Sequence, residues 1–399
     1  MKQTCHMEKL NKNIETDVCI IGGGLAALVT ALKLSEAGFK VCILEADRVG
    51  NGNTEKSSAI VTVAHDLIYY RLIKKHGLEV AKKYLEIQED ALQEIKNLGA
   101  EESDFIFEGS KRKLRKEKAA YGKLGHKDFP ILKNQAILNP KEFVRLLVSK
   151  LKNVEIFENT KVSEKPDGNR LKVGEHTVTA NFFVVATHFP YFVFPGLYFV
   201  KMYQHRSYNI IFRGKINHCC EGKKFEIRPF GEDAVMVCGG HVRTGKSKNQ
   251  YKKVLKFARR RGLTEEVSRY AAQDCMTPDL LPYAGKVYDN VYVITGFNKW
   301  GFTNSFACAN IVTDLIKGKN SGNIFCPSRP LSIKILANFG NAVVNLLKIG
   351  GPRCTHMGCK LKWNKHEKSW DCPCHGSRFN KDGKILDGPA TKCLKKISD

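Results

Sequence analysis

The sequence predicts an α/β protein, in which a doubly wound domain is followed by a small β-rich domain at the C-terminus. Three features of the chain support this prediction. A strand, a glycine turn, a helix and a second strand follow one another between Asp17 and Ala46. Two later segments, 181–190 and 290–316, also read as buried strands that end in small-residue turns. Two short boxes of cysteine and histidine near the C-terminus are spaced to hold a metal centre.

The first of these segments carries a dinucleotide-binding turn. The strand 18–21 leads into Gly22-Gly-Gly24-Leu-Ala-Ala27, which matches the pattern Gly-x-Gly-x-x-Ala. Gly22 permits a tight turn, Gly24 lets the backbone approach a pyrophosphate, and Ala27 keeps helix and strand close together. We expect the following helix, 28–37, to direct its free N–H groups at the phosphates.

An acidic residue completes the pattern. A second strand, 41–44, is closed by Glu45, which falls 21 residues after Gly24, where a carboxylate can accept hydrogen bonds from an adenosine ribose. The alternative is a glycine-rich turn that binds no ligand. Because strand, helix, second strand and acidic residue all follow in order, the segment favours a bound dinucleotide, but it does not separate FAD from NAD.

The two C-terminal boxes predict an iron–sulfur centre. The first offers Cys354 and His356 as Cys-x-His, the second offers Cys372 and His375 as Cys-x-x-His, and fifteen residues separate His356 from Cys372. Two thiolates and two imidazoles can hold a [2Fe–2S] cluster with the cysteines on one iron and the histidines on the other, which is the Rieske arrangement. A tetrahedral zinc site is the alternative, but common zinc patterns pair cysteine with cysteine and histidine with histidine.

Two segments in the middle of the chain distinguish among the dinucleotide cofactors. The strand that begins at Asn181 ends in Ala186-Thr187-His-Phe-Pro, and the strand that begins at Asn290 ends in Gly296-Phe-Asn-Lys-Trp-Gly301, ahead of a predicted helix at 305–316. They resemble FAD-dependent oxidoreductases of the glycine-oxidase and D-amino-acid-oxidase type. That resemblance implies an antiparallel substrate sheet over the flavin, and a loop, 50–58, along the cofactor. The implied FAD contacts are Gly22, Gly24, Ala27, Glu45, Ala186, Thr187, Gly296 and Gly301.

The resemblance extends to a subgroup in which this flavin domain is fused to a C-terminal Rieske domain. The segments 202–208 and 272–278 carry it, together with the run Cys372-Pro-Cys-His-Gly-Ser-Arg-Phe, and it spans roughly residues 15–330 and 354–396. In the Rieske pattern the remaining cysteine of each box, here Cys359 and Cys374, joins the other in a disulfide. Rieske domains also devote several strands to a base before the first box, and here that half is missing. The cluster is therefore shielded by the flavin domain or by a second subunit, or else the C-terminus is a remnant without iron.

These features divide the chain into three parts. Residues 1–330 form the flavin domain, with FAD-binding segments at 15–60, 140–190 and 286–325 and substrate segments at 61–139 and 191–285. Residues 331–350 form a linker, in which 331–348 read as an amphipathic helix with polar positions spaced 4, 3, 4, 3 and an apolar stripe. We expect it to pack between the domains, and a helix on a membrane surface is the weaker alternative. Residues 351–399 form the shortened Rieske domain.

The composition describes a basic globular protein. Its 399 residues carry a net charge of +25, and the densest run, 111–118, reads as a solvated basic loop without the interleaved aromatics of a nucleic-acid site. We therefore expect no nucleic acid and favour an acidic electron-transfer protein as partner. The segment 1–16 lacks a signal peptide and no apolar run is long enough to span a membrane, which together predict a cytoplasmic protein. Most of the 14 cysteines are then expected to be buried thiols.

The predicted function is electron transfer from a small amine or amino-acid-like donor, through flavin, to the cluster and an external acceptor. A flavin oxidase that uses O2 and has lost its cluster, and a non-enzymatic redox module, are the alternatives. The candidate catalytic or substrate-binding residues are His65, His205, Arg206, His241, Lys299 and Trp300. Each of these side chains is also compatible with ordinary packing.

Overall fold

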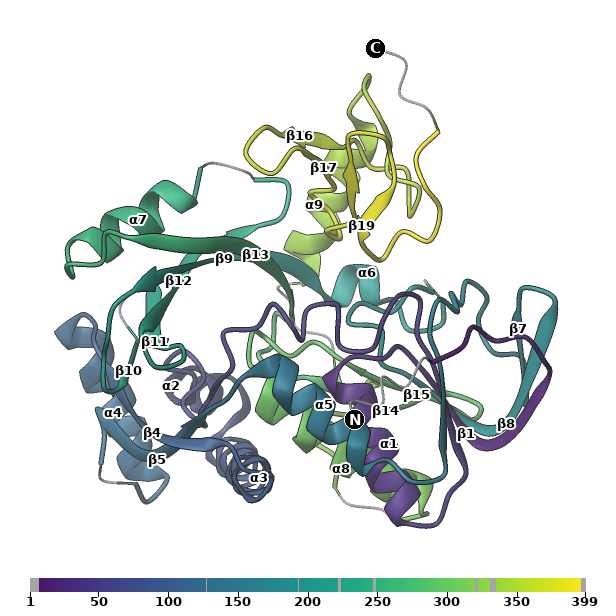
Figure 1. The fold of residues 1–399 in the computed structure, drawn as a ribbon, viewed down its shortest axis with the longest axis horizontal. Helices are drawn as coiled ribbons and strands as arrows, with labels where there is room; N and C mark the ends of the chain where they lie inside the picture. The colour runs from purple at the N-terminus through teal and green to yellow at the C-terminus, as the bar shows by residue number, and fades with distance from the viewer. Residues whose placement is uncertain are drawn as a thin grey trace.

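The computed structural model describes residues 7–126, 128–192, 194–221, 224–246, 249–319, 322–330 and 335–395 (Figure 1). The start of the segment expected to lack a signal peptide, 1–6, and the start of the predicted linker helix, 331–334, lie outside these residues. The α/β prediction is confirmed: helices and strands build two large sheets with helical layers, followed by a small C-terminal sheet. None of the helices in the described part of the chain combines the length and the apolar character needed to cross a bilayer.

The first sheet is the nucleotide-binding one. Five of its strands run parallel in the order β15-β8-β1-β2-β6. Strand β14 pairs antiparallel with β15 at one edge, and β7 pairs antiparallel with the first residues of β8. Both faces of β1 are buried, since Val18 and Ile20 pack with the helical layer whereas Cys19 and Ile21 pack on the opposite face. Burial on both faces explains why these strands read as continuous apolar runs. The strands are β1 (Ile14–Ile21), β2 (Val41–Leu44), β6 (Val154–Phe157), β7 (Arg170–Val173), β8 (His176–Val185), β14 (Tyr283–Tyr288) and β15 (Val291–Thr295).

Four helices form the layer beside this sheet. At its centre α1 (Leu25–Glu36) and α8 (Gly301–Ile316) pack against each other, while α5 (Pro140–Lys150) packs on α1 and α3 (Leu78–Asn97) on α8. Both central helices begin earlier than the apolar pattern predicts, α1 at residue 25 instead of 28 and α8 at 301 instead of 305. The small residues of the two turns enter the first helical turn directly, so each helix N-terminus comes close to the end of the preceding strand.

The second sheet has eight strands in the order β13-β9-β12-β11-β10-β4-β5-β3 and is antiparallel except for the pair β10–β4. Helix α7 (Tyr251–Arg259) packs on β9 and β12, and α2 (Tyr69–His76) packs on α3 and α4 (Lys111–Lys123). Its strands are β3 (Ile60–Val61), β4 (Glu101–Phe107), β5 (Ile131–Ile137), β9 (Tyr203–Arg213), β10 (Cys219–Glu221), β11 (Phe225–Pro229), β12 (Ala234–Arg243) and β13 (Glu266–Met276).

The basic run at 111–118 is a helix, so the prediction of a loop there was wrong. It forms the first two turns of α4, in which Glu117 and Tyr121 are buried while most of the lysines and arginines are exposed. The buried Glu117 carboxylate accepts backbone hydrogen bonds from Tyr69 and Tyr70 at the start of α2. This tie holds α4 against the protein and gives a charged sequence a reason to be helical.

The C-terminal part is a four-stranded antiparallel sheet beside helix α9 (Ile335–Leu347). Figure 1 shows this sheet seated over β9, β13 and the short helix α6 (Tyr198–Lys201). Strands follow one another in the order β16 (Lys362–Asn364), β17 (Ser369–Asp371), β18 (Arg378–Asn380) and β19 (Ile385–Asp387).

Helix α9 packs through the opposite face from the one that its amphipathic pattern predicts. Asn338 and Asn345 are only 5% and 4% exposed, whereas Phe339, Leu346 and Leu347 are 51%, 46% and 73% exposed. The buried asparagines find hydrogen-bond partners in the protein, as for Asn338 with Arg243 at 3.0 Å. The linker is therefore packed, as expected, but by its polar side.

Candidate functional site

An elongated cavity of about 340 Å³ lies along one edge of the first sheet. It runs past the carboxyl ends of β1, β2, β8 and β15, where ligands of open α/β sheets bind. Of the eight predicted FAD contacts, seven line it, and so do most residues of the loop 50–58. These seven are Gly22, Gly24, Glu45, Ala186, Thr187, Gly296 and Gly301.

The first turn is shaped for a close backbone approach. Gly22 has a φ of +107°, and a Cβ built there would lie 2.6 Å from the carbonyl oxygen of Ala186. The next two residues lead into the N-terminus of α1, where the Leu25 N–H donates to the Thr54 hydroxyl at 3.0 Å. Ala27 does not line the cavity; it is fully buried in the core, which suits the packing role given to it. The turn therefore brings Gly24 and the N-terminus of α1 to the cavity wall, and helix N-termini of this kind are favourable sites for a dinucleotide phosphate.

Glu45 holds the turn as well as facing the cavity. Its carboxylate accepts hydrogen bonds from the backbone N–H groups of Gly23 and Asp47. Burial raises the pKa of Glu45, and these two bonds act in the opposite direction. The residues at this end of the cavity therefore fit the adenosine half of FAD.

The far end of the cavity contains a buried charge cluster that the sequence only partly predicted. Lys299, after β15, lies 3.4 Å from a carboxylate oxygen of Asp66. Burial acts to lower the pKa of Lys299, but the carboxylates of Asp66, Glu226 and Asp274 outweigh it and hold that pKa above its ordinary value. The ammonium group is therefore charged and surrounded by acidic side chains.

A chain of hydrogen bonds runs through this cluster. The Ser207 hydroxyl donates to Asp274 at 2.8 Å and lies 3.0 Å from His241 Nδ1. Burial lowers the pKa of His241 to about 3, so the ring is neutral, and Nδ1 donates to Ser207. That tautomer leaves Nε2 as an acceptor, 3.7 Å from Glu226. Burial raises the pKa of Glu226 to about 7, which poises this carboxyl to exchange a proton near neutral pH.

A second cavity, of about 440 Å³, adjoins the first. The two share Glu226, His241 and Lys299 in their walls. The far wall of the second cavity comes from α2, β4 and the basic helix α4, including Lys113 and Lys116. The charge cluster therefore stands between the predicted cofactor site and a chamber that a small molecule can enter.

The cysteine and histidine boxes come together at the edge of the C-terminal sheet. The sulfur atoms of Cys359, Cys372 and Cys374 all lie within 4.8 Å of one another. The Cys354 thiol donates a hydrogen bond to the sulfur of Cys372, which raises the pKa of Cys354 and lowers that of Cys372. Cys359 and Cys374 are free thiols in the structure. Because their sulfur atoms lie close together, the disulfide between them stays a prediction.

The two histidines of the boxes have surroundings that suit metal binding. The rings of His356 and His375 lie 5.1 Å apart, centroid to centroid, at 81°. Burial lowers the pKa of His356 to about 4 and that of His375 to about 3, so both rings are neutral, the form that binds metal. Nδ1 of His356 and both ring nitrogens of His375 are buried without a hydrogen-bond partner among the described residues. Unpaired imidazole nitrogens beside clustered thiols fit a [2Fe–2S] centre with two cysteines and two histidines.

The flavin domain and α9 hold the second cluster loop by its backbone. Four consecutive carbonyl oxygens of this loop accept side-chain hydrogen bonds from outside the C-terminal sheet. Two glycines bring the surfaces into contact, since a Cβ on Gly245 would lie 2.6 Å from Pro373 and one on Gly376 would lie 2.7 Å from Gln204. The bonds are Asn341 to Pro373 at 3.0 Å, Arg243 to Cys374 at 3.2 Å, Gln204 to His375 at 2.8 Å and Gln273 to Gly376 at 2.8 Å.

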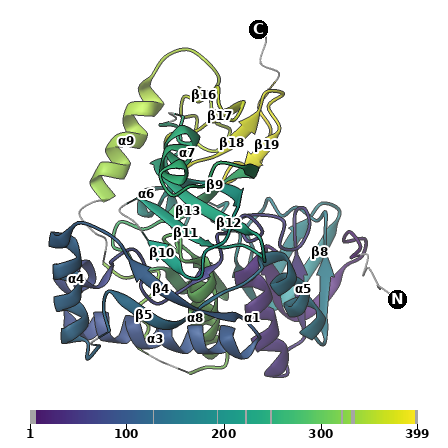
Figure 2. The same ribbon diagram turned by 60° about the vertical axis from the view of Figure 1, so that its left-hand side comes forward.

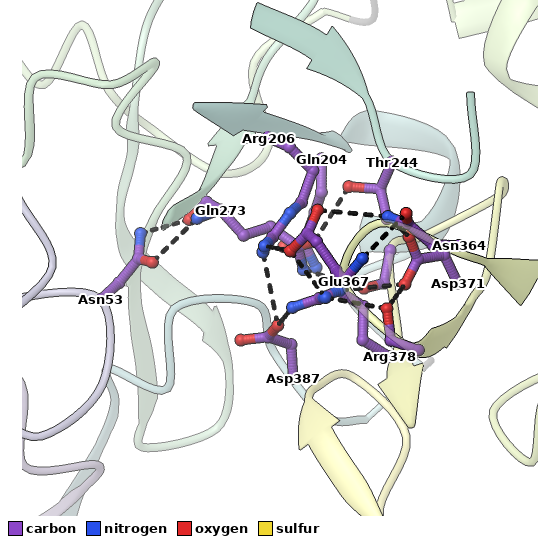
Figure 3. Close-up of polar contacts among 12 residues, drawn as sticks. Asn53, Gln204, Arg206, Thr244, Gln273, Asn364, Glu367, Asp371, Arg378 and Asp387 are labelled. Atoms are coloured by element: carbon purple, nitrogen blue, oxygen red, sulfur yellow. Dashed lines mark hydrogen bonds and ion pairs between the residues drawn. The ribbon is translucent and has the colours of Figure 1, made fainter. Parts of the chain in front are cut away.

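A buried ion-pair network joins the C-terminal sheet to β9 (Figure 3). Arg378 makes 2.9 Å contacts with Glu367, Asp371 and Asp387. Arg206 of β9 pairs with the same Glu367 and lies 3.7 Å from Asp387. The C-terminal sheet is thus supported by the second, eight-stranded sheet through buried ion pairs.

Comparisons with known proteins agree with this geometry. The model of the FAD-dependent oxidoreductase family (DAO) matches residues 17–112 and 131–315, which is more than half of the chain. The chain belongs to this family. Residues 345–398 match the Rieske [2Fe-2S] domain. The two cofactors of the chain are accordingly FAD and a Rieske [2Fe–2S] cluster, and the chain is an electron-transfer oxidoreductase.

One relative spans both parts. YhfW of Bacillus subtilis (strain 168), named as a Rieske 2Fe-2S iron-sulfur protein, is 31% identical over 481 aligned residues, covering 97% of this chain and 94% of its own length. The alignment is longer than this chain, so YhfW has segments without a counterpart here. A cytochrome b6-f complex iron-sulfur subunit of Microcystis aeruginosa is 48% identical over 62 residues, 15% of this chain and 29% of that one.

Solved structures confirm the flavin-domain fold. Glycine oxidase from Geobacillus kaustophilus superposes with a TM-score of 0.64 at 14% identity, covering 80% of this chain and all of the other. L-Amino acid deaminase from Proteus vulgaris gives 0.64 at 12% identity, covering 81% and 100%. At this identity the likeness concerns the fold alone.

The structure separates the candidate catalytic residues. Lys299 and His241 line both cavities, and Trp300 lines the first. His65 and His205 line neither. His65 is instead buried, lying 2.7 Å from the Tyr84 hydroxyl and 2.9 Å from that of Thr303, with its ring stacked on Trp300 at 4.9 Å.

Two features of the site depart from the sequence prediction. Arg206 does not reach either cavity, because it is committed to the ion pair with Glu367. Conversely, Asp66, Ser207, Glu226 and Asp274 were missed. Asp274 lies within the quoted segment 272–278, whereas Glu226 is an isolated acid in a strand and gives no signal in the sequence.

Proposed function

We propose that the chain oxidises a small amine, amino acid or related donor and passes the electrons, through FAD and then the Rieske cluster, to an external acceptor. Bound FAD supplies a hydride acceptor that can release electrons singly, and histidine-ligated clusters carry single electrons at about −150 to +300 mV, above plant-type ferredoxins. That order of potentials suits flow from flavin to cluster.

The turn after β8 is the observation that carries this proposal. His188 lines the first cavity. The ring of the next residue, Phe189, lies 6.4 Å, centroid to centroid, from the ring of His375. Phe199 of α6 lies against the same ring at 5.9 Å, and His375 is 2% exposed. One short, tightly packed segment therefore separates the FAD cavity from a cluster ligand, which favours direct transfer within the chain.

The charge cluster supports an amine as the donor. Asp66, Glu226 and Asp274 place acidic side chains around the junction of the two cavities, where a protonated amine would be attracted. An amine must lose a proton before it can give up a hydride. We assign proton acceptance to Glu226, whose pKa of about 7 suits a base at neutral pH.

The acceptor side follows from charge. We propose an acidic electron-transfer protein as the external acceptor, because the net charge of +25 would attract and orient it. We also propose a cytoplasmic setting, since the described cysteines outside the boxes are free thiols and most of them are buried.

Anaerobic substrate addition tests the proposal. The purified chain is mixed with a panel of amines, amino acids and hydroxy acids while flavin absorbance and the low-temperature EPR signal of the cluster are recorded. We expect the flavin to bleach first and a Rieske signal with a low average g to follow. A cluster signal that precedes bleaching contradicts the scheme. Rapid peroxide formation without bound iron would indicate a plain flavin oxidase, and no turnover with any donor would indicate a redox module.

A further inference from the structure

The outward face of α9 is an apolar ridge. The polar face of the same helix packs on the protein and fixes this orientation. Asn338, Asn341 and Asn345 face the protein, where they bond to Arg243, to the Pro373 carbonyl and to the α9 backbone. Ala342, between them, packs on the C-terminal core. This pins the helix with its other face turned outward, and Figure 2 shows α9 at the periphery of the molecule.

The ridge is large for a protein surface. Six of its side chains are large and apolar, and they follow the helix and its C-terminal end as one stripe. Exposed apolar patches of this kind mark an interaction site, either with another protein or with a membrane. The side chains are Phe339 (51% exposed), Val343 (37%), Val344 (55%), Leu346 (46%), Leu347 (73%) and Ile349 (90%).

Positive charge surrounds the C-terminal end of the ridge. Arg353 donates to the carbonyls of Leu346 and Lys348, and Lys360 donates to that of Ile349. The pKa of Lys362 is lowered, mainly by burial and also by the nearby charges of Lys348 and Lys246. These hydrogen bonds hold Arg353 and Lys360 at the C-terminal end of the ridge.

Most acidic side chains of the C-terminal part are engaged in ion pairs away from the ridge. Within residues 335–395, Glu367, Asp371 and Asp387 point into the ion pairs with Arg206 and Arg378. Asp382 is the remaining acid of this stretch and lies on the surface. The outer face therefore combines apolar side chains with uncompensated lysine and arginine, the pattern of helices that lie in the interface of an anionic membrane.

Two other occupants fit less well. A second copy of the chain would bring the lysines and arginines of both ridges together, at a cost in charge repulsion. A protein partner would bury a convex stripe whose members offer no hydrogen-bonding side chain, whereas protein interfaces carry about one hydrogen bond per 100–200 Å². A lipid surface needs only apolar insertion and an anionic headgroup layer.

We propose that α9 is a membrane-surface anchor, which inserts its apolar ridge into a bilayer carrying anionic lipids. Arg353 donates to the carbonyls of both Leu346 and Gly358, which belongs to the first cluster loop, so anchoring brings that loop close to the lipid surface. The proposal does not depend on the donor, on the direction of electron flow or on retention of the cluster.

Vesicle co-sedimentation of the full chain, followed by its flavin absorbance, tests this directly. We expect binding to phosphatidylcholine vesicles that contain phosphatidylglycerol, and weak binding to phosphatidylcholine alone. The double variant Val344→Gln/Leu347→Gln should lower the partition constant by about 100-fold. Lys348→Gln and Lys362→Gln should each lower it about fivefold. Val267→Gln, on β13, removes another exposed valine (56%) and should leave binding unchanged.

Several outcomes would overturn the anchor. Equal binding by the parent and the double variant would mean that the overall positive charge suffices. No vesicle binding, together with a dimer that the double variant dissolves in gel filtration, would assign the ridge to a second copy. No vesicle binding, together with binding to an acidic carrier protein that the double variant loses, would assign it to that partner. Because these measurements do not use turnover, their failure is distinct from failure of the proposed function.

Discussion

At the scale of single residues, Gly22 and Gly38 share a positive φ but differ in what surrounds them. Both have a positive φ, +107° and +90°, which costs any other residue about 1–2 kcal/mol. A Cβ on Gly22 would also clash with the Ala186 carbonyl, whereas one on Gly38 would meet open space. Comparing substitutions at these two positions therefore distinguishes backbone strain from loss of the close approach that the cofactor turn requires.

We predict that Gly22→Ala yields a chain without FAD, because the turn must move away from β8 and open the phosphate cradle. Gly38→Ala should keep FAD and lose only about 1–2 kcal/mol of stability. Flavin absorbance of the purified variants, compared with their thermal unfolding, makes the distinction. Full FAD occupancy in Gly22→Ala would show that the turn does not approach the cofactor as described.

Glu226 gives a prediction with a pH dependence. Burial raises its pKa to about 7, so the carboxylate needed as a base forms as the pH rises through about 7 and is lost as the pH falls. Flavin reduction by an amine donor should follow that profile. Glu226→Gln should slow it by about 10²–10⁴-fold and remove the pH dependence near 7.

Anaerobic stopped-flow measurement of flavin bleaching across pH provides the readout. Glu232→Gln is the matched control, because Glu232 is an exposed acid on the turn after β11. An unchanged pH profile in Glu226→Gln would assign the base to another group.

Side chains that need a distant partner were the hardest to predict. The glycine turns and the metal boxes are local patterns that can be read from their spacing. The structure puts the glycine turns along the first cavity and brings together Cys359, Cys372 and Cys374 of the boxes, while the predicted ligand set stays a prediction. Arg206 and His65 carry no such pattern. Their roles come from Glu367, which is 161 residues away, and from Thr303, which is 238 residues away. Sequence reasoning therefore took a structural arginine and a buried histidine for catalytic candidates.

At the scale of secondary structure, strand β9 carries the C-terminal sheet through Arg206. Its guanidinium group is buried against Glu367, which Arg378 also contacts, so removing Arg206 leaves this buried carboxylate with one cationic partner in place of two. Breaking a buried pair outright costs about 3–5 kcal/mol, and losing Arg206 should cost part of that. Arg213, at the other end of β9, pairs with Glu265 while 70% exposed, and such surface pairs contribute about 0–1 kcal/mol. The same strand thus offers a test and its control.

We predict that Arg206→Met loosens the C-terminal sheet and lowers the iron content while FAD is retained. Arg213→Met should leave both cofactors in place. Iron and flavin analysis of the two purified variants, with thermal unfolding monitored in parallel, measures the effect. If the two variants retain iron equally, the ion-pair network does not support the cluster.

Helices α4 and α9 show why amphipathic patterns can mislead. Periodicity reports that a helix has two faces, but not which face meets the protein. In α9 the asparagines are the packed face, because Arg243 and the Pro373 carbonyl supply their partners. In α4 the buried Glu117 anchors a run that otherwise reads as a solvated loop.

At the scale of the whole molecule, the chain combines two cofactor sites in one packed body. The presence of both domains followed from the sequence, since each has its own motifs, and the comparisons confirm them. How the shortened Rieske domain is supported did not follow, because the support comes from side chains of the substrate sheet and α9 that lie far away in the sequence. The flavin domain supplies most of these contacts, through side chains of β9, β12 and β13.

The same packing makes the central claim testable, namely that electrons pass from flavin to cluster within one chain, across the His188–Phe189 turn. The measurement is the rate at which the Rieske EPR signal appears after rapid anaerobic reduction of the flavin, recorded over a range of protein concentrations. We predict a first-order rate that does not change with concentration. A rate that rises in proportion to concentration, or flavin reduction that never produces the signal, would contradict the account.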